Sequence, residues 1–346
     1  MYAKFVKTVL IVTTTLLLMS ILVVVVCDPF AQYHTPWLGL QPLLNRGTQS
    51  YANPGMAKSY PYDSLLIGSS VAENFYASQF DEAFDCKTLK LPYAGGSATN
   101  YSTIMDVAFR HRVLKNVFHS LDMFAVINDP SLPKYTLPDY LYDDNIWNDT
   151  DYVLNKDVFD YLYKMIDANQ KGEIPDLDSA YNWESEYSFS KKRVLKFYDR
   201  PRVSSKTTDI DKYIENIDAS LDTITAYIEQ HPKTRFVIFF PPYSILWFDN
   251  LIRKGLLDAM TTGMEHTMAR LLTYDNVELY SFAGCEDVIT NLDNYRESMH
   301  FSEKINAYMV DCMKEGKYRI TKRNYRDEMT RLEDFVSNYD YDAIFE

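Results

Sequence analysis

Two short segments, far apart in the sequence, contain the residue types needed for acyl transfer. Ser70 follows a short apolar segment through Gly68 and stands just before a predicted helix. A hydroxyl at such a turn is exposed, and neighbouring backbone N–H groups can bind an oxyanion. Near the C-terminus, Glu297 stands three residues before His300. A carboxylate at that spacing can orient an imidazole while the imidazole takes a proton from a serine. The pattern predicts that Ser70 is a nucleophile.

Two further segments could help to bind the oxyanion. Gly95 and Gly96 follow a second apolar segment, where the missing side chains let the backbone approach a substrate closely. Asn128 follows a third apolar segment and offers a carboxamide donor, although a turn residue before a proline is an equal alternative. The structural alternatives for Ser70 and His300 are a helix N-cap and a surface histidine that caps the next helix.

Five apolar segments that alternate with amphipathic ones must position these residues. The predicted strands span residues 62–67, 88–92, 121–127, 235–240 and 277–281, and the predicted helices span 71–84, 98–115, 209–229, 250–273, 301–314 and 322–336. This alternation predicts a mostly parallel five-stranded sheet covered on both faces, in a three-layer α/β/α sandwich. In such sheets, ligands bind beyond the carboxyl ends of the strands, where Ser70, Gly95 and Asn128 would lie.

The N-terminus predicts a membrane anchor. Residues 8–27 contain no charge and, as a helix, would cross roughly 30 Å of hydrocarbon. Lys4 and Lys7 precede this segment, so the positive-inside rule places the short N-terminus in the cytoplasm and the rest outside. A cleaved signal peptide is the alternative. Its apolar region is usually shorter, about 7–15 residues, and is followed by small residues, whereas valines precede Cys27 here.

The predicted organisation has five parts. These are a cytoplasmic N-terminus (1–7), a transmembrane anchor (8–27), an irregular juxtamembrane segment (28–60), an α/β domain (61–315) with an insertion at about 129–205, and a C-terminal helix with an acidic tail (316–346).

Composition excludes several classes of protein. With 47% hydrophobic and 24% charged residues, the 346-residue chain is neither disordered nor a many-pass membrane protein. A net charge of −13 argues against nucleic acid as a partner. The four cysteines have no metal-binding spacing, and since Cys27 lies in the apolar segment, the other three allow at most one disulfide. We expect no metal or organic cofactor.

The order and spacing of these motifs resemble the SGNH (GDSL-type) hydrolase superfamily of esterases and acyltransferases, over about residues 60–315. The resemblance implies that Ser70 is the nucleophile, Gly95 or Gly96 the oxyanion glycine, Asn128 the oxyanion asparagine and His300 the base. It also implies a flavodoxin-like α/β/α fold.

The chain departs from the family pattern at three positions. Ser69 replaces the usual aspartate before the nucleophile, Val126 replaces a glycine before Asn128, and Glu297 replaces the aspartate that precedes the histidine. The glutamate keeps the carboxylate on an arm longer by one methylene. Asp293 is a rival orienting acid.

More closely, the chain resembles an uncharacterised bacterial group of single-anchor SGNH-like membrane proteins. The segments that carry this resemblance are YDSLLIGSSVAENF (62–75), KLPYAGGS (90–97), PDYLYDDN (138–145), FFPPYS (239–244) and YRESMHFSEKIN (295–306). The resemblance implies an extracytoplasmic, membrane-anchored serine esterase or O-acyltransferase that acts on acylated cell-envelope glycans or polymers. The alternatives are a non-catalytic subunit that works with a multipass membrane acyltransferase, and a purely structural surface protein.

Overall fold

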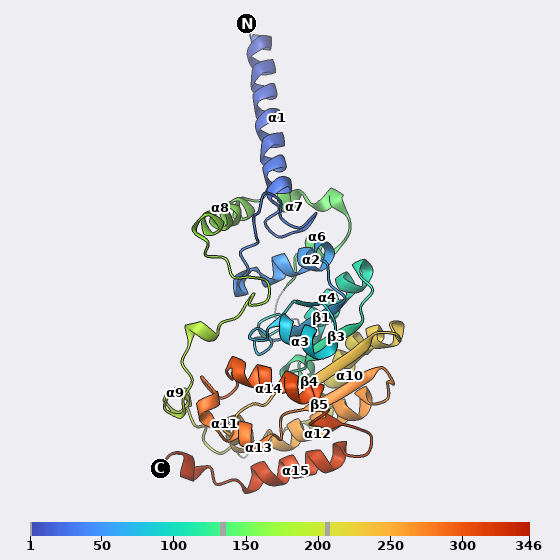
Figure 1. Ribbon diagram of the computed structural model, residues 1–346, viewed down its shortest axis with the longest axis vertical. Coiled ribbons are helices and arrows are strands. Elements are labelled where there is room, and N and C mark those ends of the chain that lie inside the picture. Colours follow the sequence, from blue (N-terminus) through green and yellow to red (C-terminus); the bar gives the residue numbers. More distant parts are fainter. Residues whose placement is uncertain (1, 132–135, 205–207) are drawn as a thin grey trace.

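A six-stranded, mostly parallel sheet forms the centre of the protein (Figure 1). The structure is a computed structural model that describes residues 2–131, 136–204 and 208–346. The strands are β1 (Ser64–Gly68), β2 (Thr88–Lys90), β3 (Asn116–Ser120), β4 (Arg235–Phe240), β5 (Val277–Ser281) and β6 (Arg319–Ile320), in the order β2-β1-β3-β4-β5-β6. The first five are parallel, and β6 pairs antiparallel with β5.

Helices cover the sheet in two groups that follow from the strand order. On one side, α4 (Ala98–His111), α10 (Ile210–Gln230) and α12 (Leu257–Leu271) pack in series, whereas α3 (Ala77–Phe84) packs against α14 (Glu303–Lys314). Because parallel crossovers are right-handed, the connections that run in opposite directions from β1 place their helices on opposite faces. The central strands β1 and β3 are therefore completely buried, as expected of a parallel sheet.

The remaining helices lie outside these two groups. They are α2 (Gln49–Ser59), α5 (Met123–Ile127), α6 (Asp139–Tyr142), α7 (Thr150–Val153), α8 (Lys156–Lys171), α9 (Lys191–Phe197), α11 (Ile245–Lys254), α13 (Glu286–Ile289) and α15 (Tyr325–Asn338). Short 3-10 turns occur at Arg46–Thr48, Ile146–Asn148, Glu184–Glu186, Leu292–Asn294 and Asp342–Ile344. The predicted insertion carries α6 to α9, and its residues 132–135 and 205 lie outside the described chain.

The prediction of a strand at 121–127 was wrong. The strand is β3, Asn116–Ser120, and the apolar run that follows it forms the short helix α5 with Asp122 at its N-cap position. Both segments are mostly buried, and a short apolar run does not distinguish a buried strand from a buried helix. The third strand therefore ends at Ser120 rather than at residue 127, so Asn128 does not directly follow a strand.

Three smaller predictions also change. The sheet has six strands rather than five, because β6 from the predicted C-terminal segment joins its edge. The helix predicted at 250–273 is interrupted at Gly255, which has a φ of 68° and ends α11. The segment 28–60 contains the regular helix α2, which packs against α4.

The N-terminal helix α1 (Tyr2–Cys27) projects away from the rest of the protein (Figure 1). Its most apolar 18-residue stretch has a mean hydropathy of 2.9, and the helix is long and apolar enough to cross a membrane. Asp28 fixes its C-terminal end, since this carboxylate accepts the backbone N–H groups of residues 32–34 and the hydroxyl of Tyr152. The orientation of α1 in a membrane remains a prediction.

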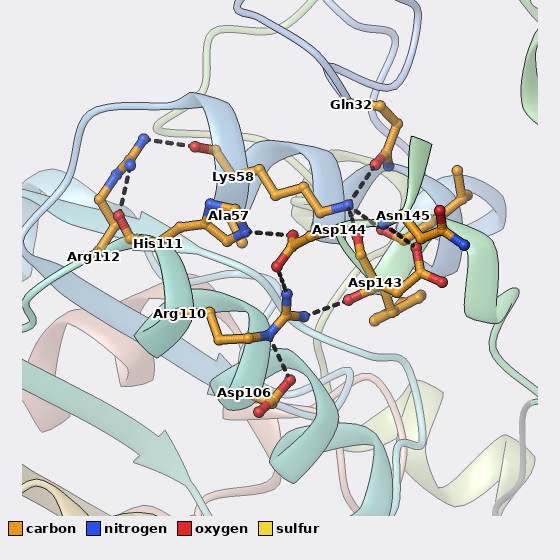
Figure 2. Close-up of polar contacts among 12 residues, drawn as sticks. Gln32, Ala57, Lys58, Asp106, Arg110, His111, Arg112, Asp143, Asp144 and Asn145 are labelled. Atoms are coloured by element: carbon orange, nitrogen blue, oxygen red, sulfur yellow. Dashed lines mark hydrogen bonds and ion pairs between the residues drawn. The ribbon is translucent and has the colours of Figure 1, made fainter. Parts of the chain in front are cut away.

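Charged side chains connect α2, α4 and the segment 141–145, which runs from the end of α6 into the following loop (Figure 2). Lys58 donates to the carbonyls of Leu141 (2.8 Å) and Asp143 (2.6 Å). Arg110 and His111, at the end of α4, both bind Asp144. We use the name α2–α4 charge network for these six residues: Lys58, Arg110, His111, Leu141, Asp143 and Asp144.

Candidate active site

A tight turn between residues 295 and 301 carries the predicted base and its carboxylate. The backbone N–H of Arg296 donates to the carbonyl of His300 (3.0 Å), and Tyr295 and Phe301 form an antiparallel bridge that closes the turn. Within it, the Glu297 carboxylate accepts the backbone N–H groups of Met299 (3.2 Å) and His300 (2.8 Å). The backbone thus fixes the carboxylate beside the imidazole.

Ser70 lies at the end of β1, where the chain makes a close approach to β3. A Cβ added at Gly68 would lie 2.8 Å from the Cβ atoms of both Ala72 and Ser120, so only glycine fits there without rearrangement. The helix predicted from residue 71 begins only at Ala77, and Ser70 lies in a non-helical turn. Its hydroxyl is therefore not an N-cap of α3.

The structure brings Ser70, His300 and Glu297 together. Ser70 Oγ lies 2.7 Å from His300 Nε2, and His300 Nδ1 forms a hydrogen bond with Glu297 Oε1. In the tautomer that donates Nδ1–H to the carboxylate, Nε2 accepts the serine proton. The three side chains form a continuous hydrogen-bonded relay of the kind that activates a serine.

Glu297 is held in its charged form. Burial by itself raises the pKa of this carboxyl, but the hydrogen bonds from the His300 side chain and from the backbone outweigh that effect. The net result is a pKa below its usual range, which suits a carboxylate that stabilises an imidazolium. The rival Asp293 is exposed and accepts the backbone N–H of Lys191 (2.7 Å) instead.

The relay opens into a cavity of about 780 Å³. The residues that line it are Arg46, Ser69, Ser70, Ala94, Gly95, Gly96, Ser97, Asp122, Phe124, Asn128, Asp129, Tyr243, Arg296, Met299 and His300. All the residues predicted from the sequence except Glu297 thus face one space. Among the described residues, no group of three or more histidine, cysteine or acidic side chains is arranged to hold a metal ion.

The two glycines in the loop after β2 differ in backbone conformation and in the hydrogen bonding of their N–H groups. Gly95 has a φ of 67°, which favours glycine, and within the described chain its N–H donates no hydrogen bond. The N–H of Gly96 donates to the carbonyl of Tyr93 (2.8 Å). Gln49 accepts the N–H of Ala94 (2.8 Å) and so fixes the loop from α2. Gly95 rather than Gly96 is therefore available to an oxyanion.

Asn128 is not arranged as the sequence suggested. Because α5 replaces the predicted strand end, Asn128 lies at the C-terminal end of a helix, and its Nδ2 donates to the carbonyl of Phe124 (2.7 Å). It remains exposed at the wall of the cavity.

Asp122 occupies the position after the third strand that the sequence analysis gave to Asn128. It lines the cavity, is buried, and accepts a hydrogen bond from the hydroxyl of Tyr243. Burial raises the pKa of this carboxyl to about 7, against the opposing effect of hydrogen bonds from Ser69. Placing the strand at 116–120 would have identified Asp122 from the sequence.

Trp183 gave no signal in the sequence, because it comes from the predicted insertion. Its indole N–H donates to the carbonyl of Ser70 (3.0 Å), and its ring meets the His300 ring edge-on at 5.4 Å. Its own backbone N–H donates to the buried Asn74 (3.0 Å). Trp183 thus contacts both the nucleophile's backbone and the base.

Comparisons with known proteins add little to this geometry. No family model matches the sequence, and no curated protein matches it either. Among solved structures, the chain is similar to a protein from Streptococcus pneumonia whose name assigns it as a platelet activating factor. The identity is 10% and the TM-score 0.41, over 78% of this chain and 90% of that one. The roles of the residues therefore rest on this chain's own geometry.

Proposed function

We propose that the protein is a serine esterase or O-acyltransferase of the SGNH type that acts on acyl groups of cell-envelope glycans or polymers. The observation that carries the proposal is the relay from Ser70 through His300 to Glu297, which opens into the 780 Å³ cavity. In this proposal α1 spans the cell membrane and the α/β domain lies outside the cytoplasm. The layout resembles that of anchored SGNH proteins, which is the source of the substrate class.

In the first half-reaction, Ser70 Oγ attacks the acyl carbonyl while His300 Nε2 takes its proton. The tetrahedral oxyanion is bound by the backbone N–H groups of Ser70 and Gly95, neither of which donates a hydrogen bond within the described chain. Each such donor contributes roughly 3–4 kcal/mol to transition-state stabilisation in well-formed sites. Because the Asn128 amide is bonded to its own helix, we leave it out of this group. His300 then gives the proton to the leaving alcohol, and an acyl-Ser70 ester remains.

In the second half-reaction, His300 activates the acyl acceptor. Water as the acceptor gives hydrolysis, and a sugar hydroxyl gives transfer to a new ester. In both cases Ser70 regains its proton through His300, and Glu297 stabilises the imidazolium that forms in each step.

Labelling of the full chain in detergent with a fluorophosphonate probe tests this proposal. We expect wild type to be labelled at Ser70, and Ser70→Ala and His300→Ala to abolish labelling. Ser97→Ala is the matched control, because Ser97 lines the same cavity but its hydroxyl bonds to Asn100 rather than to a base. That variant should label like wild type.

Absence of label on folded wild type would contradict the catalytic proposal. The protein would then be better explained as a non-catalytic subunit of a membrane-embedded acyltransferase, recognisable by a multipass partner that remains bound after Ser70→Ala. Protease protection of residues after 28 in intact cells would contradict the proposed location.

A further inference from the structure

Arg296 places a positive charge close to the proposed nucleophile. Its guanidinium carbon lies 4.3 Å from the centroid of the Trp183 ring and 4.0 Å from that of Tyr187. The same indole contacts His300 and donates to Ser70. One aromatic ring thus separates this cation from the reacting groups, and Arg296 lines the same cavity.

Within the described part of the chain, Arg296 forms no ion pair, and its Nη1 is buried without an acceptor. The other arginine in the cavity wall, Arg46, is bound by the buried carboxylate of Glu73 at 2.6 Å. The nearby Glu297 is bonded to His300. A partly buried guanidinium cannot lose its proton, so an unpaired one is costly until an anion binds it.

We propose that Arg296 binds an anionic group of the substrate, a carboxylate or a phosphate, next to the ester that Ser70 attacks. The two aromatic rings hold the guanidinium in a fixed orientation, which suits bidentate recognition of planar or tetrahedral oxyanions. This inference rests on the proposed function and narrows its substrate class to acyl esters of acidic glycans or phosphate-containing polymers.

The test compares the acetate esters of three sugars of similar size. One sugar is neutral (methyl glucoside), and two are anionic: methyl glucuronide carries a carboxylate and glucose phosphate carries a phosphate. We expect full-length wild type to hydrolyse at least one anionic ester with a kcat/KM at least about tenfold above that of the neutral ester. Arg296→Gln should bring this ratio close to one. Arg326→Gln removes an equal charge from an exposed site elsewhere and should keep the ratio. The two anionic esters distinguish carboxylate from phosphate recognition.

A ratio near one in wild type, or an unchanged ratio in Arg296→Gln, would overturn the inference while leaving the esterase proposal intact. Calorimetric binding of methyl glucuronide and glucose phosphate to the Ser70→Ala protein provides a readout that needs no catalysis. Binding that Arg296→Gln abolishes would support the anion site even if no ester is hydrolysed, and absence of binding would contradict it.

A second, independent observation concerns the surface around the end of α1. Four apolar side chains there are largely exposed: Trp37 (53%), Leu38 (81%), Ile146 (67%) and Trp147 (86%). Trp37 stacks on His34 at 3.9 Å, and His34 Nε2 lies 2.8 Å from the carbonyl of Val25 in the last turn of α1. This places Trp37 beside the end of the apolar helix.

The Ile146–Trp147 turn belongs to the same surface. Asp149, two residues after Trp147, accepts a hydrogen bond from the hydroxyl of Tyr33 (2.9 Å), and α7, which follows it, packs against α1. The amphipathic rings of tryptophan favour the headgroup level of a bilayer. We infer that this surface, with α1 inserted, rests on the lipid headgroups of the membrane.

Quenching of tryptophan fluorescence by brominated lipids tests this contact in the full chain reconstituted in nanodiscs. Wild type should be quenched, and Trp37→Phe and Trp147→Phe should each remove part of the quenched signal. Trp247→Phe removes a buried tryptophan and should leave the quenched component in place. An equal quenched signal in the Trp37→Phe/Trp147→Phe double variant would overturn the contact.

Discussion

The α2–α4 charge network and the active-site cavity each contain an arginine, and the two are held in opposite ways. Arg110 binds Asp106 and Asp144, and Lys58 beside it donates to two backbone carbonyls (Figure 2). The guanidinium of Arg296 packs against two aromatic side chains and has no carboxylate within ion-pair distance in the described chain. The first region joins three segments of the fold, whereas the second leaves its charge available to a ligand.

The two regions should also respond differently to substitution. In the network, each cation already has acceptors that hold it in place, so removing one of its groups should change stability and not chemistry. In the cavity, Ser70, His300 and Glu297 are bonded mainly to one another, so removing one should change chemistry and leave stability nearly intact. Glu297→Gln, Lys58→Met and Asp144→Asn test this division, and a fourth prediction concerns Asp122, a buried carboxyl in the cavity wall whose protonation should change stability.

The largest expected effect is that of Glu297→Gln. The amide keeps the shape of the side chain but no longer stabilises the imidazolium, so we expect the rate of ester hydrolysis to fall on the order of 10³-fold or more. The free energy of unfolding should change by less than about 1 kcal/mol. Glu297→Asp, with a shorter arm, should retain an intermediate rate. If a thermal melt showed that Glu297→Gln is unfolded at the temperature of the rate measurement, the division would be contradicted.

Asp122 should make stability depend on pH. Burial raises the pKa of its carboxyl to about 7, so the folded state keeps a proton that the unfolded state releases near pH 4. The stabilisation is present below about pH 4 and is lost as the pH rises through about 7. Relative to Asp122→Asn, the free energy of unfolding of wild type should therefore fall by a few kcal/mol between pH 4 and 8, since one pKa unit corresponds to about 1.4 kcal/mol. Urea titrations of both proteins across this pH range measure the difference. The prediction would be refuted if the free energies of unfolding of the two proteins changed equally with pH.

Lys58→Met should act on stability alone. The carbonyls of Leu141 and Asp143 would lose their donor in a partly buried site, at a cost of about 1–3 kcal/mol. Urea titration of the intact chain in detergent measures this loss, and labelling by the fluorophosphonate probe should continue at the wild-type rate. Lost labelling at unchanged stability would show that the network serves the active site.

The smallest expected effect is that of Asp144→Asn. This carboxylate binds Arg110 and His111, but its side chain is about half exposed, so the pair is screened by water and salt. We expect a loss below about 1 kcal/mol that shrinks further at high ionic strength. A loss of several kcal/mol, insensitive to salt, would mean that the network is more buried than the structure shows.

The sequence alone determined the features that depend on short segments. The apolar helix at the N-terminus and the strands β4 and β5 follow from local hydrophobicity, and β4 and β5 were predicted residue for residue. The order of Ser70, the glycine loop and the Glu297–His300 turn along alternating strands and helices was also enough to predict that they meet, because parallel strands end at one edge of a sheet.

The tertiary structure decided the rest, because it depends on contacts between distant segments. Ser70 and His300 are 230 residues apart, and Trp183 reaches Ser70 across 113. Whether Met123–Ile127 forms a strand or a helix depends on which residues pair with β1 and β4. As a result Asp122, and not Asn128, follows the third strand, and Asn128 lies at the end of α5. The absence of an ion pair at Arg296, within the described residues, is likewise invisible in the sequence, because it depends on where the tertiary structure places the carboxylates.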